Sequence, residues 1–247
     1  MRDFTGKRVL ITGGSSGIGR AIAQAMVRAG ARVTITGRDP QKLADVVRVD
    51  TTLAAEVCDV TDDVAIVALR DRLVADGGID VLVNNAGIMA FFRVIDRFPM
   101  EDQLEEIDID VVGPIKMIEH FLPSLLARES LIVNVSSGLA YVPYAGAPVY
   151  SACKAFIHAY TRCLREQLEP TSVRVVELLP PVVDTPLAQA NAAASPFPMM
   201  PPEKLAEALM RGLRRGDIEI APGPARQLKW LSRFAPGFIF HQLNKQR

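Results

Sequence analysis

The chain has 247 residues, of which 49% are hydrophobic and 23% are charged, so it is long enough to bury a sizeable core. Its 28 lysines and arginines equal its 28 aspartates and glutamates, and this balance gives no whole-chain field that would attract nucleic acid or acidic partners. Three cysteines without CxxC spacing and three widely separated histidines predict neither a disulfide framework nor a metal site.

Seven short apolar runs predict buried strands along the whole chain. They cover residues 9–12, 33–36, 53–58, 81–84, 131–135, 173–179 and 218–220. Most segments between them carry apolar residues at three- and four-residue spacing, as at Ile18, Ile22 and Met26, and this spacing predicts helices. Gly30 is expected to end the first of these helices. Because the strands are apolar on both faces and alternate with helices, we predict a doubly wound parallel sheet with helices on both faces, a Rossmann-like α/β fold.

No Gly/Ser linker divides the chain, so we expect one domain over residues 1–247. Residues 188–202 are rich in alanine and proline, and we expect a mobile substrate loop at about 184–202. The first residues lack the apolar core of a signal peptide, and no 18 apolar residues run together as a spanning helix requires. These features favour a cytoplasmic protein in a reducing compartment.

A glycine-rich stretch, ITGGSSGIGRAIAQAM at residues 11–26, lies between the first predicted strand and the first predicted helix. At this point a doubly wound sheet presents helix N-terminal N–H groups to phosphate. The stretch follows G-x-x-x-G-x-G rather than G-x-G-x-x-G, yet its glycines still permit a tight turn and a close backbone approach to a diphosphate. Ser15 and Ser16 add hydroxyl donors. On this stretch alone, a glycine-rich turn without a ligand is the alternative.

Several short motifs follow this stretch in a family-specific order. They are TGGSSGIG at 12–19, CDV at 58–60, NNAG at 84–87, Ser137, and YSACK at 150–154. In order and approximate spacing the chain resembles the short-chain dehydrogenase/reductase family over nearly its whole length. Its length and glycine spacing are similar to those of the simple reductases of that family rather than of the longer epimerase and dehydratase branch. The resemblance implies a nicotinamide-dependent hydride transfer.

Tyr150 and Lys154 lie four residues apart in a segment with helical spacing, so both side chains occupy one helix face. A phenol is a poor base at neutral pH, but a nearby ammonium and the positive nicotinamide of an oxidised cofactor would favour its phenolate. Tyr150 is therefore the candidate general acid and base, and Ser137 is expected to hydrogen-bond the same substrate oxygen. Only the resemblance selects Ser137 over Ser136. Taken singly, these residues could also be a core tyrosine, a solvated lysine and a strand-end serine.

Cofactor preference is predicted from the end of the second strand. Where relatives that use the unphosphorylated cofactor place an acidic residue on the adenosine ribose, this chain has Gly37, followed by Arg38 and Asp39. The missing carboxylate and the neighbouring guanidinium favour NADP(H) over NAD(H), with a solvated loop arginine as the alternative.

The resemblance also implies a set of cofactor-binding residues. Asp59 and Asn85 match positions near the adenine and its ribose, or they cap or brace a strand end, and Val183 and Thr185 match contacts to the nicotinamide carboxamide, or form a plain turn. The full set is Gly13, Ser15, Ser16, Gly17, Ile18, Gly19, Arg38, Asp59, Val60, Asn85, Ala86, Gly87, Tyr150, Lys154, Val183 and Thr185. The chain departs from the family pattern near these residues. Pro180-Pro181 replaces the usual Pro-Gly, and the second proline stiffens the entry to the loop.

Asp110 is a second departure, because it replaces the asparagine of the family's catalytic tetrad. In the family that asparagine acts largely through its main-chain carbonyl, which holds a water that relays protons to the lysine. Pro114 lacks the N–H that would bind carbonyl 110, so we expect this carbonyl to be free and the relay to be preserved. If the carboxylate lies near Lys154, it should stabilise the ammonium and raise the pKa of Tyr150. A solvent-facing helix residue is the alternative.

Residues 225–247 are rich in lysine and arginine, lack acidic residues and contain several aromatic side chains. Such a basic amphipathic segment could lie on an anionic membrane surface. Pro236-Gly237 interrupts its helical pattern, and we favour packing over the substrate loop or against another subunit. His158 and Cys153, near Tyr150, are interpreted as packing residues.

These features predict an NADP(H)-dependent oxidoreductase that interconverts a carbonyl and a secondary alcohol, with Tyr150 as general acid and base and with Ser137, Lys154 and Asp110 beside it. Phe197, Met199 and Met200 in the loop favour an apolar or bulky small-molecule substrate. We expect a homo-oligomer, either a dimer or a tetramer. The alternatives are a catalytically weak NADP(H)-binding regulatory protein and a peripheral membrane protein.

Overall fold

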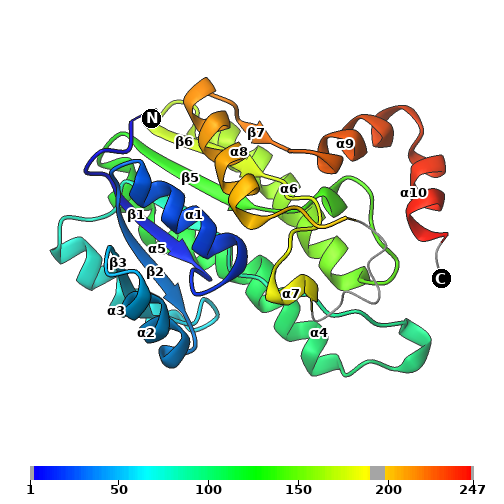
Figure 1. Ribbon diagram of the computed structural model, residues 1–247, viewed down its shortest axis with the longest axis horizontal. Coiled ribbons are helices and arrows are strands. Elements are labelled where there is room, and N and C mark those ends of the chain that lie inside the picture. The colour runs from blue at the N-terminus through cyan, green and yellow to red at the C-terminus, as the bar shows by residue number, and fades with distance from the viewer. Residues whose placement is uncertain (1–2, 190–197, 246–247) are drawn as a thin grey trace.

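The computed structural model describes residues 3–189 and 198–245, and seven strands among them form one parallel sheet (Figure 1). The strands are β1 (Arg8–Thr12), β2 (Arg32–Gly37), β3 (Leu53–Val57), β4 (Val81–Asn84), β5 (Ser130–Val135), β6 (Val173–Leu178) and β7 (Glu219–Ile220). Their order in the sheet is β3-β2-β1-β4-β5-β6-β7, and every neighbouring pair is parallel. The predicted doubly wound fold is confirmed, with each strand within one residue of its expected ends.

Helices connect these strands along the described chain. The α-helices are α1 (Gly17–Arg28), α2 (Pro40–Val49), α3 (Asp63–Ala75), α4 (Met100–Ile107), α5 (Gly113–Leu126), α6 (Pro148–Leu168), α7 (Pro186–Gln189), α8 (Pro202–Arg215), α9 (Pro224–Phe234) and α10 (Pro236–Asn244). Short 3₁₀ turns η1 (Val94–Asp96) and η3 (Gly138–Ala140) and one π-helical turn η2 (Asp108–Val112) complete them. The π turn leads directly into α5.

The sheet has one buried apolar cluster on each face. On one face Ile11 of β1 packs with Ile22 of α1 and with residues of α2 and α8, while on the other face Leu10 packs with Phe121 of α5 and with residues of α3 and α6. Figure 1 shows α1 and α8 covering the same face. Successive residues of a strand point to opposite faces, which is why the middle of β1, residues 9–11, is apolar throughout.

Local signals set the ends of several helices. Gly30 follows α1 with φ of +87°, a left-handed conformation that favours glycine and ends the helix as expected. Asp39 begins α2, because its carboxylate accepts the N–H groups of Gln41 and Lys42. The Asp39 carboxylate, whose charge would oppose a phosphate bound beside Arg38, thus caps α2.

The expected loop at 184–202 contains the short helix α7, and beyond the undescribed part Met200 pairs with Val183. Residues 190–197, including Phe197, lie outside the described residues. The C-terminal segment forms two helices that meet at Ala235, as Pro236-Gly237 predicts. No helix within residues 3–189 and 198–245 is long and apolar enough to cross a membrane, and no group of metal-ligating side chains gathers there.

Candidate functional site

The glycine-rich stretch forms the turn between β1 and α1, and its glycines leave no room for side chains. A Cβ on Gly13 would lie 2.8 Å from the Cα of Ala86, one on Gly17 2.9 Å from Cγ2 of Thr185, and one on Gly19 2.4 Å from the carbonyl oxygen of Gly13. The turn brings the N-terminus of α1 to the carboxyl edge of the sheet. There the free N–H groups and the positive end of the helix dipole favour a phosphate.

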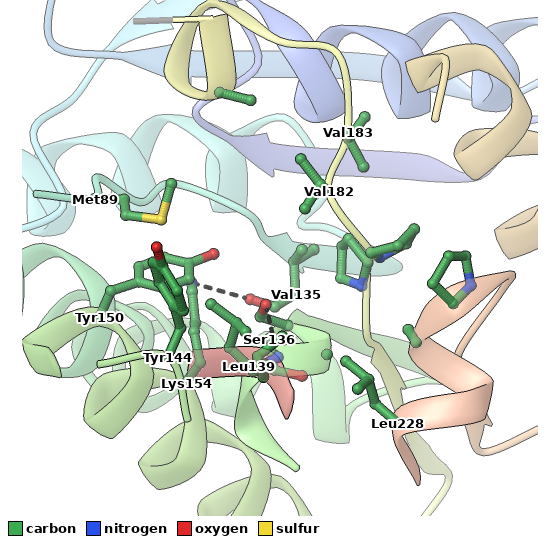
Figure 2. Close-up of a pocket in the computed structure, with 18 of the residues that line it drawn as sticks. Met89, Val135, Ser136, Leu139, Tyr144, Tyr150, Lys154, Val182, Val183 and Leu228 are labelled. Atoms are coloured by element: carbon green, nitrogen blue, oxygen red, sulfur yellow. Dashed lines mark hydrogen bonds between the residues drawn. The ribbon is translucent and has the colours of Figure 1, made fainter. Parts of the chain in front are cut away.

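A pocket of about 490 Å³ opens beside this turn at the carboxyl ends of β4, β5 and β6 (Figure 2). Its walls come from the segment after β4, the end of β5, the start of α6, residues 180–183, and helices α9 and α10. Most lining side chains are apolar, and Lys154 is the one charged side chain that the described residues contribute to it. Figure 2 shows Tyr150, Tyr144 and Met89 projecting into this space.

Tyr150 and Ser137 both line the pocket, and their side chains lie near enough for Ser137 to affect the pKa of Tyr150. Tyr150 lies in the first turn of α6, and Ser137 follows β5 and also accepts the N–H of Leu139 at 3.1 Å. Burial raises the pKa of Tyr150, the charges of Asp110 and Glu106 add to this effect, and Lys154 and Ser137 oppose it. At neutral pH the Tyr150 phenol is therefore protonated and can donate a proton.

Lys154 lies one helical turn after Tyr150 with its side chain 6% exposed, which excludes the solvated alternative. Its Nζ is 5.3 Å from the centre of the Tyr150 ring and donates a hydrogen bond of 3.3 Å to the carbonyl of Val135. Burial alone would lower the pKa of Lys154, but the Asp110 carboxylate and the Tyr150 oxygen outweigh it and raise that pKa. The ammonium is therefore retained beside the tyrosine.

Asp110 is the partner of this ammonium, with Oδ2 at 2.9 Å from Nζ of Lys154. Its side chain is 0% exposed, so the solvent-facing alternative is wrong. The other oxygen, Oδ1, accepts the N–H of Ile88 at 2.8 Å. The π turn η2 carries Asp110, and Pro114 lies just after it in α5 without an N–H. The Asp110 side chain thus reaches Lys154, which meets the condition stated from the sequence.

The residues expected around the adenine and ribose have structural partners of their own. Arg38 forms an ion pair of 2.6 Å with Glu105, and these side chains are 59% and 45% exposed. Asp59 accepts both the N–H and the hydroxyl of Thr61. Asn85 donates to the carbonyls of Thr12 and Gly13 at 2.9 and 3.1 Å, so it braces the glycine-rich turn.

The structure gathers only part of the predicted set around the pocket. From that set the lining contains Ile18, Asn85, Gly87, Ser137, Tyr150, Lys154, Val183 and Thr185. Thr185 and Ala86 also contact the glycine turn, and Asp110 lies directly behind Lys154. Arg38, Asp59 and Val60 lie beyond the pocket near the end of β3.

Two buried carboxyl groups near the site escaped the sequence analysis. Glu106 is 0% exposed one helical turn before Asp110, and this spacing of four residues was the available signal. Glu177, an acid inside the apolar strand β6, accepts the hydroxyl of Ser136 at 2.5 Å and lies 2.9 Å from Nδ1 of His158. His158 is therefore a hydrogen-bonding partner rather than a simple packing residue.

The C-terminal helices cover the pocket. Leu228 and Leu231 of α9 and Ile239 and Leu243 of α10 line it. Asn244 attaches α10 to the segment before α6, because its side chain accepts the N–H of Ala145 at 2.7 Å and donates to the carbonyl of Pro143 at 3.2 Å. This part of the segment packs over the site, as favoured from its sequence.

Comparisons with known proteins agree on one family. A family model described as short chain dehydrogenase matches residues 7–195. The uncharacterized oxidoreductase DltE of Bacillus subtilis (strain 168) is 35% identical over 251 residues, which cover 98% of each chain.

Two solved structures extend the likeness to the fold. A short chain dehydrogenase from Burkholderia cenocepacia J2315 in complex with NADP has a TM-score of 0.87 and 25% identity, covering 98% of each chain. A 3-ketoacyl-(acyl-carrier-protein) reductase from Brucella melitensis complexed with NADH has a TM-score of 0.76 and 28% identity, covering 85% of this chain and 91% of that chain. Proteins similar to this chain thus bind either dinucleotide.

Proposed function

The chain belongs to the short-chain dehydrogenase family and is a nicotinamide-dependent oxidoreductase, and we propose that it interconverts a ketone and a secondary alcohol with NADP(H), using Tyr150 as general acid and base. One observation carries this proposal. The Tyr150 hydroxyl lies in an apolar pocket between a serine hydroxyl and a buried ammonium, and this environment can stabilise either protonation state of a phenol.

The residues at the β1–α1 turn fit a dinucleotide. A Cβ at any of Gly13, Gly17 and Gly19 would collide with neighbouring protein atoms, so glycine at these positions permits the tight turn, and the N-terminus of α1 would complement the charge of a diphosphate. Val183 and Thr185, across the pocket from Tyr150, would hold the nicotinamide end. When bound, the nicotinamide supplies the hydride for reduction or accepts it in oxidation.

In reduction Tyr150 would donate its proton to the substrate oxygen as negative charge develops there, while Ser137 donates a hydrogen bond to the same oxygen. Lys154 would stabilise the phenolate that remains, and Asp110 would hold the ammonium in position. In alcohol oxidation the Tyr150 phenolate would take the proton. Asp110 thus replaces the usual asparagine through its side chain, and Pro114 still leaves carbonyl 110 without a hydrogen bond from position 114.

The lining of the pocket supports an apolar substrate. Met89, Leu228 and Leu231 contribute to its walls, and its one described cation, Lys154, is already paired with Asp110. A substrate carboxylate would find no unpaired cation among the described lining residues, so we propose an apolar ketone or alcohol.

Arg38 supports the preference for NADP(H). Its guanidinium lies just after Gly37, where a carboxylate would repel a 2′-phosphate. The cap formed by Asp39 directs that carboxylate to the N-terminus of α2 instead. Glu105 competes for the guanidinium, but the pair is exposed and therefore weak.

We further propose that residues 1–247 form one domain that assembles as a dimer or tetramer in the cytoplasm. The free thiols of Cys58, Cys153 and Cys163 suit a reducing compartment. Light scattering on the purified protein tests the assembly, and cell fractionation tests the compartment.

The experiment that tests the proposed reaction is turnover of the purified protein with NADPH and a panel of carbonyl compounds. The panel contains methyl ketones of increasing chain length and, for contrast, short 2-oxo acids, and loss of reduced-nicotinamide absorbance is followed. Tyr150→Phe, which removes one hydroxyl, should lower turnover by roughly 10² or more and leave NADPH binding nearly unchanged. Retained turnover in this variant would contradict the role of Tyr150. Tight NADPH binding without turnover across the panel would instead favour a regulatory protein.

A further inference from the structure

The segment after β4 forms one wall of the pocket, and its residues alternate in what they contact. Gly87, Met89 and Phe91 line the pocket. The N–H groups of the residues between them point to acceptors on other elements. This period of two is that of an extended chain, in which successive residues face opposite sides.

Both ends of the wall are held by groups that carry no charge. The hydroxyl of Thr12 accepts the N–H of Ala86 at 3.0 Å, and the carbonyl of Gly146 accepts the N–H of Phe92 at 3.1 Å. Thr12 ends β1 just before the glycine turn, and Gly146 precedes α6. The wall therefore spans the distance between the cofactor turn and the catalytic helix.

The middle of the wall is held by two carboxyl groups. Oδ1 of Asp110 accepts the N–H of Ile88 at 2.8 Å, and Oε1 of Glu106 accepts the N–H of Ala90 at 3.2 Å. Asp110 has the ammonium of Lys154 as its ionic partner. Glu106 is 0% exposed, and its Oε2 accepts or donates no hydrogen bond among the described residues.

The setting of Glu106 opposes its ionisation. Burial raises its pKa to about 7, the charge of Asp110 adds to this effect, and the N–H of Ala90 and the ammonium of Lys154 oppose it. From α6, Tyr150 and Cys153 are the other titratable groups within its field. Glu106 thus changes between a neutral acid and a carboxylate near neutral pH.

We propose that Glu106 is a positioning residue for the substrate pocket, which acts by holding the N–H of Ala90 so that Met89 and Phe91 stay in the wall facing Tyr150. This inference rests on the proposed function in one respect only, that the pocket binds an apolar ketone or alcohol. A carboxylate accepts a hydrogen bond more strongly than a neutral carboxyl group. The wall is therefore held more firmly at pH 8 than at pH 6.

Hydrogen exchange of the individual backbone amides, followed by NMR on the full chain, tests this role without substrate or cofactor. In the wild type, protection of the Ala90 amide, corrected for intrinsic exchange, should rise several-fold between pH 6 and pH 8. Glu106→Leu should reduce that protection by roughly tenfold, while the Ile88 amide, held by Asp110, changes little. Glu106→Gln keeps an acceptor oxygen but cannot ionise, so its Ala90 protection should no longer depend on pH.

Glu101→Gln is the matched control, because Glu101 is exposed on the same helix. It should behave as the wild type. Equal Ala90 protection in Glu106→Leu and the wild type would overturn the proposal, and so would a pH dependence that survives in Glu106→Gln. A failure of the chain to turn over ketones would leave these exchange results standing, so the two proposals fail separately.

Kinetics with 2-octanone and NADPH give a second measurement. A displaced wall weakens substrate binding more than it alters proton transfer, so Glu106→Leu should raise KM roughly fivefold or more and change kcat less than twofold. A fall in kcat at constant KM would instead place Glu106 in the proton chemistry and contradict a positioning role.

Discussion

Arg38 is bound to Glu105 in the structure, and this ion pair decides how much the guanidinium contributes to cofactor preference. The pair is 2.6 Å long, but both side chains are about half exposed. Exposed pairs contribute about 0.2–1 kcal/mol, whereas a hydrogen bond to a charged group contributes about 1.5–3 kcal/mol. A 2′-phosphate should therefore win the guanidinium from Glu105.

Removal of this guanidinium should affect one cofactor only. Arg38→Ala is expected to weaken NADPH binding by about 1.5–3 kcal/mol and to leave NADH binding nearly unchanged. Glu105→Gln should strengthen NADPH binding by up to about 1 kcal/mol, because it removes a competitor and a like charge. Titration by nicotinamide fluorescence measures both, with Arg48→Ala on α2 as the charge control. Equal losses for NADPH and NADH in Arg38→Ala would show that Arg38 is structural.

Asp110 contributes to the raised pKa of Tyr150, the proposed general acid and base. Its negative charge raises the pKa of Tyr150, so Asp110→Asn should lower that pKa. Alcohol oxidation needs the phenolate, and its gain in rate on the alkaline side should therefore move to lower pH while activity is retained. The pH profile of kcat/KM for oxidation of 2-octanol with NADP⁺ measures the shift.

The exposed neighbour Asp108 supplies the control, because Asp108→Asn should leave this profile in place. An unchanged profile in Asp110→Asn would contradict the electrostatic role of the carboxylate. A wild type that is inactive on every carbonyl compound but is rescued by Asp110→Asn would show that the tetrad needs the asparagine side chain itself.

At the scale of single elements, α10 closes the pocket through few attachments. Asn244 makes two hydrogen bonds to residues 143–145, the segment that also carries the lining residue Tyr144. Asn244→Ala should loosen α10 and raise the KM for 2-octanone by roughly fivefold, the effect of about 1 kcal/mol, while NADPH affinity stays within twofold. Lys245→Ala, one residue later and exposed, should change neither value. If both variants behave alike, α10 does not form the substrate wall.

Elements differ in how well their sequence predicts them. The strands were predicted within one residue because burial on both faces requires continuous apolar runs, which the sequence shows directly. The π turn η2 was not predicted, since one extra residue in a helical turn leaves the apolar spacing almost unchanged. Asp110 lies in that turn, so the sequence could not establish that the Asp110 side chain contacts Lys154.

Buried carboxyl groups were the hardest part of the site to predict. Acidic residues are mostly exposed, so Glu106, in the run LEEIDID, resembles a solvated helix residue. Its burial depends on the segment after β4, which supplies the N–H of Ala90 from sixteen residues earlier in the chain. Asn85 lines the pocket, but its contact with the glycine turn needed the β1–β4 pairing, which the sequence does not specify.

For the whole molecule, the sheet order explains why these groups meet. The switch point between β1 and β4 leaves a crevice at the carboxyl edge of the sheet, and the glycine turn, the wall segment and the start of α6 all border it. This arrangement buries Lys154, Asp110 and Glu106 together behind the pocket. Because these ionisable groups are buried together, their charges should also affect folding.

Glu106 should make the stability of the whole molecule depend on pH. Its carboxyl group ionises near pH 4.5 in the unfolded chain and at about 7 in the folded protein. Below pH 4.5 both states hold the proton; as the pH rises towards 7 only the unfolded chain loses it, so folding loses up to about 3 kcal/mol. Glu106→Gln removes this penalty. Relative to the wild type, its free energy of unfolding should increase by roughly 2–3 kcal/mol between pH 4.5 and pH 8, measured by urea unfolding at one protein concentration. Glu101→Gln should show no such increase, and a difference between Glu106→Gln and the wild type that is the same at both pH values would mean that Glu106 ionises normally in the folded protein.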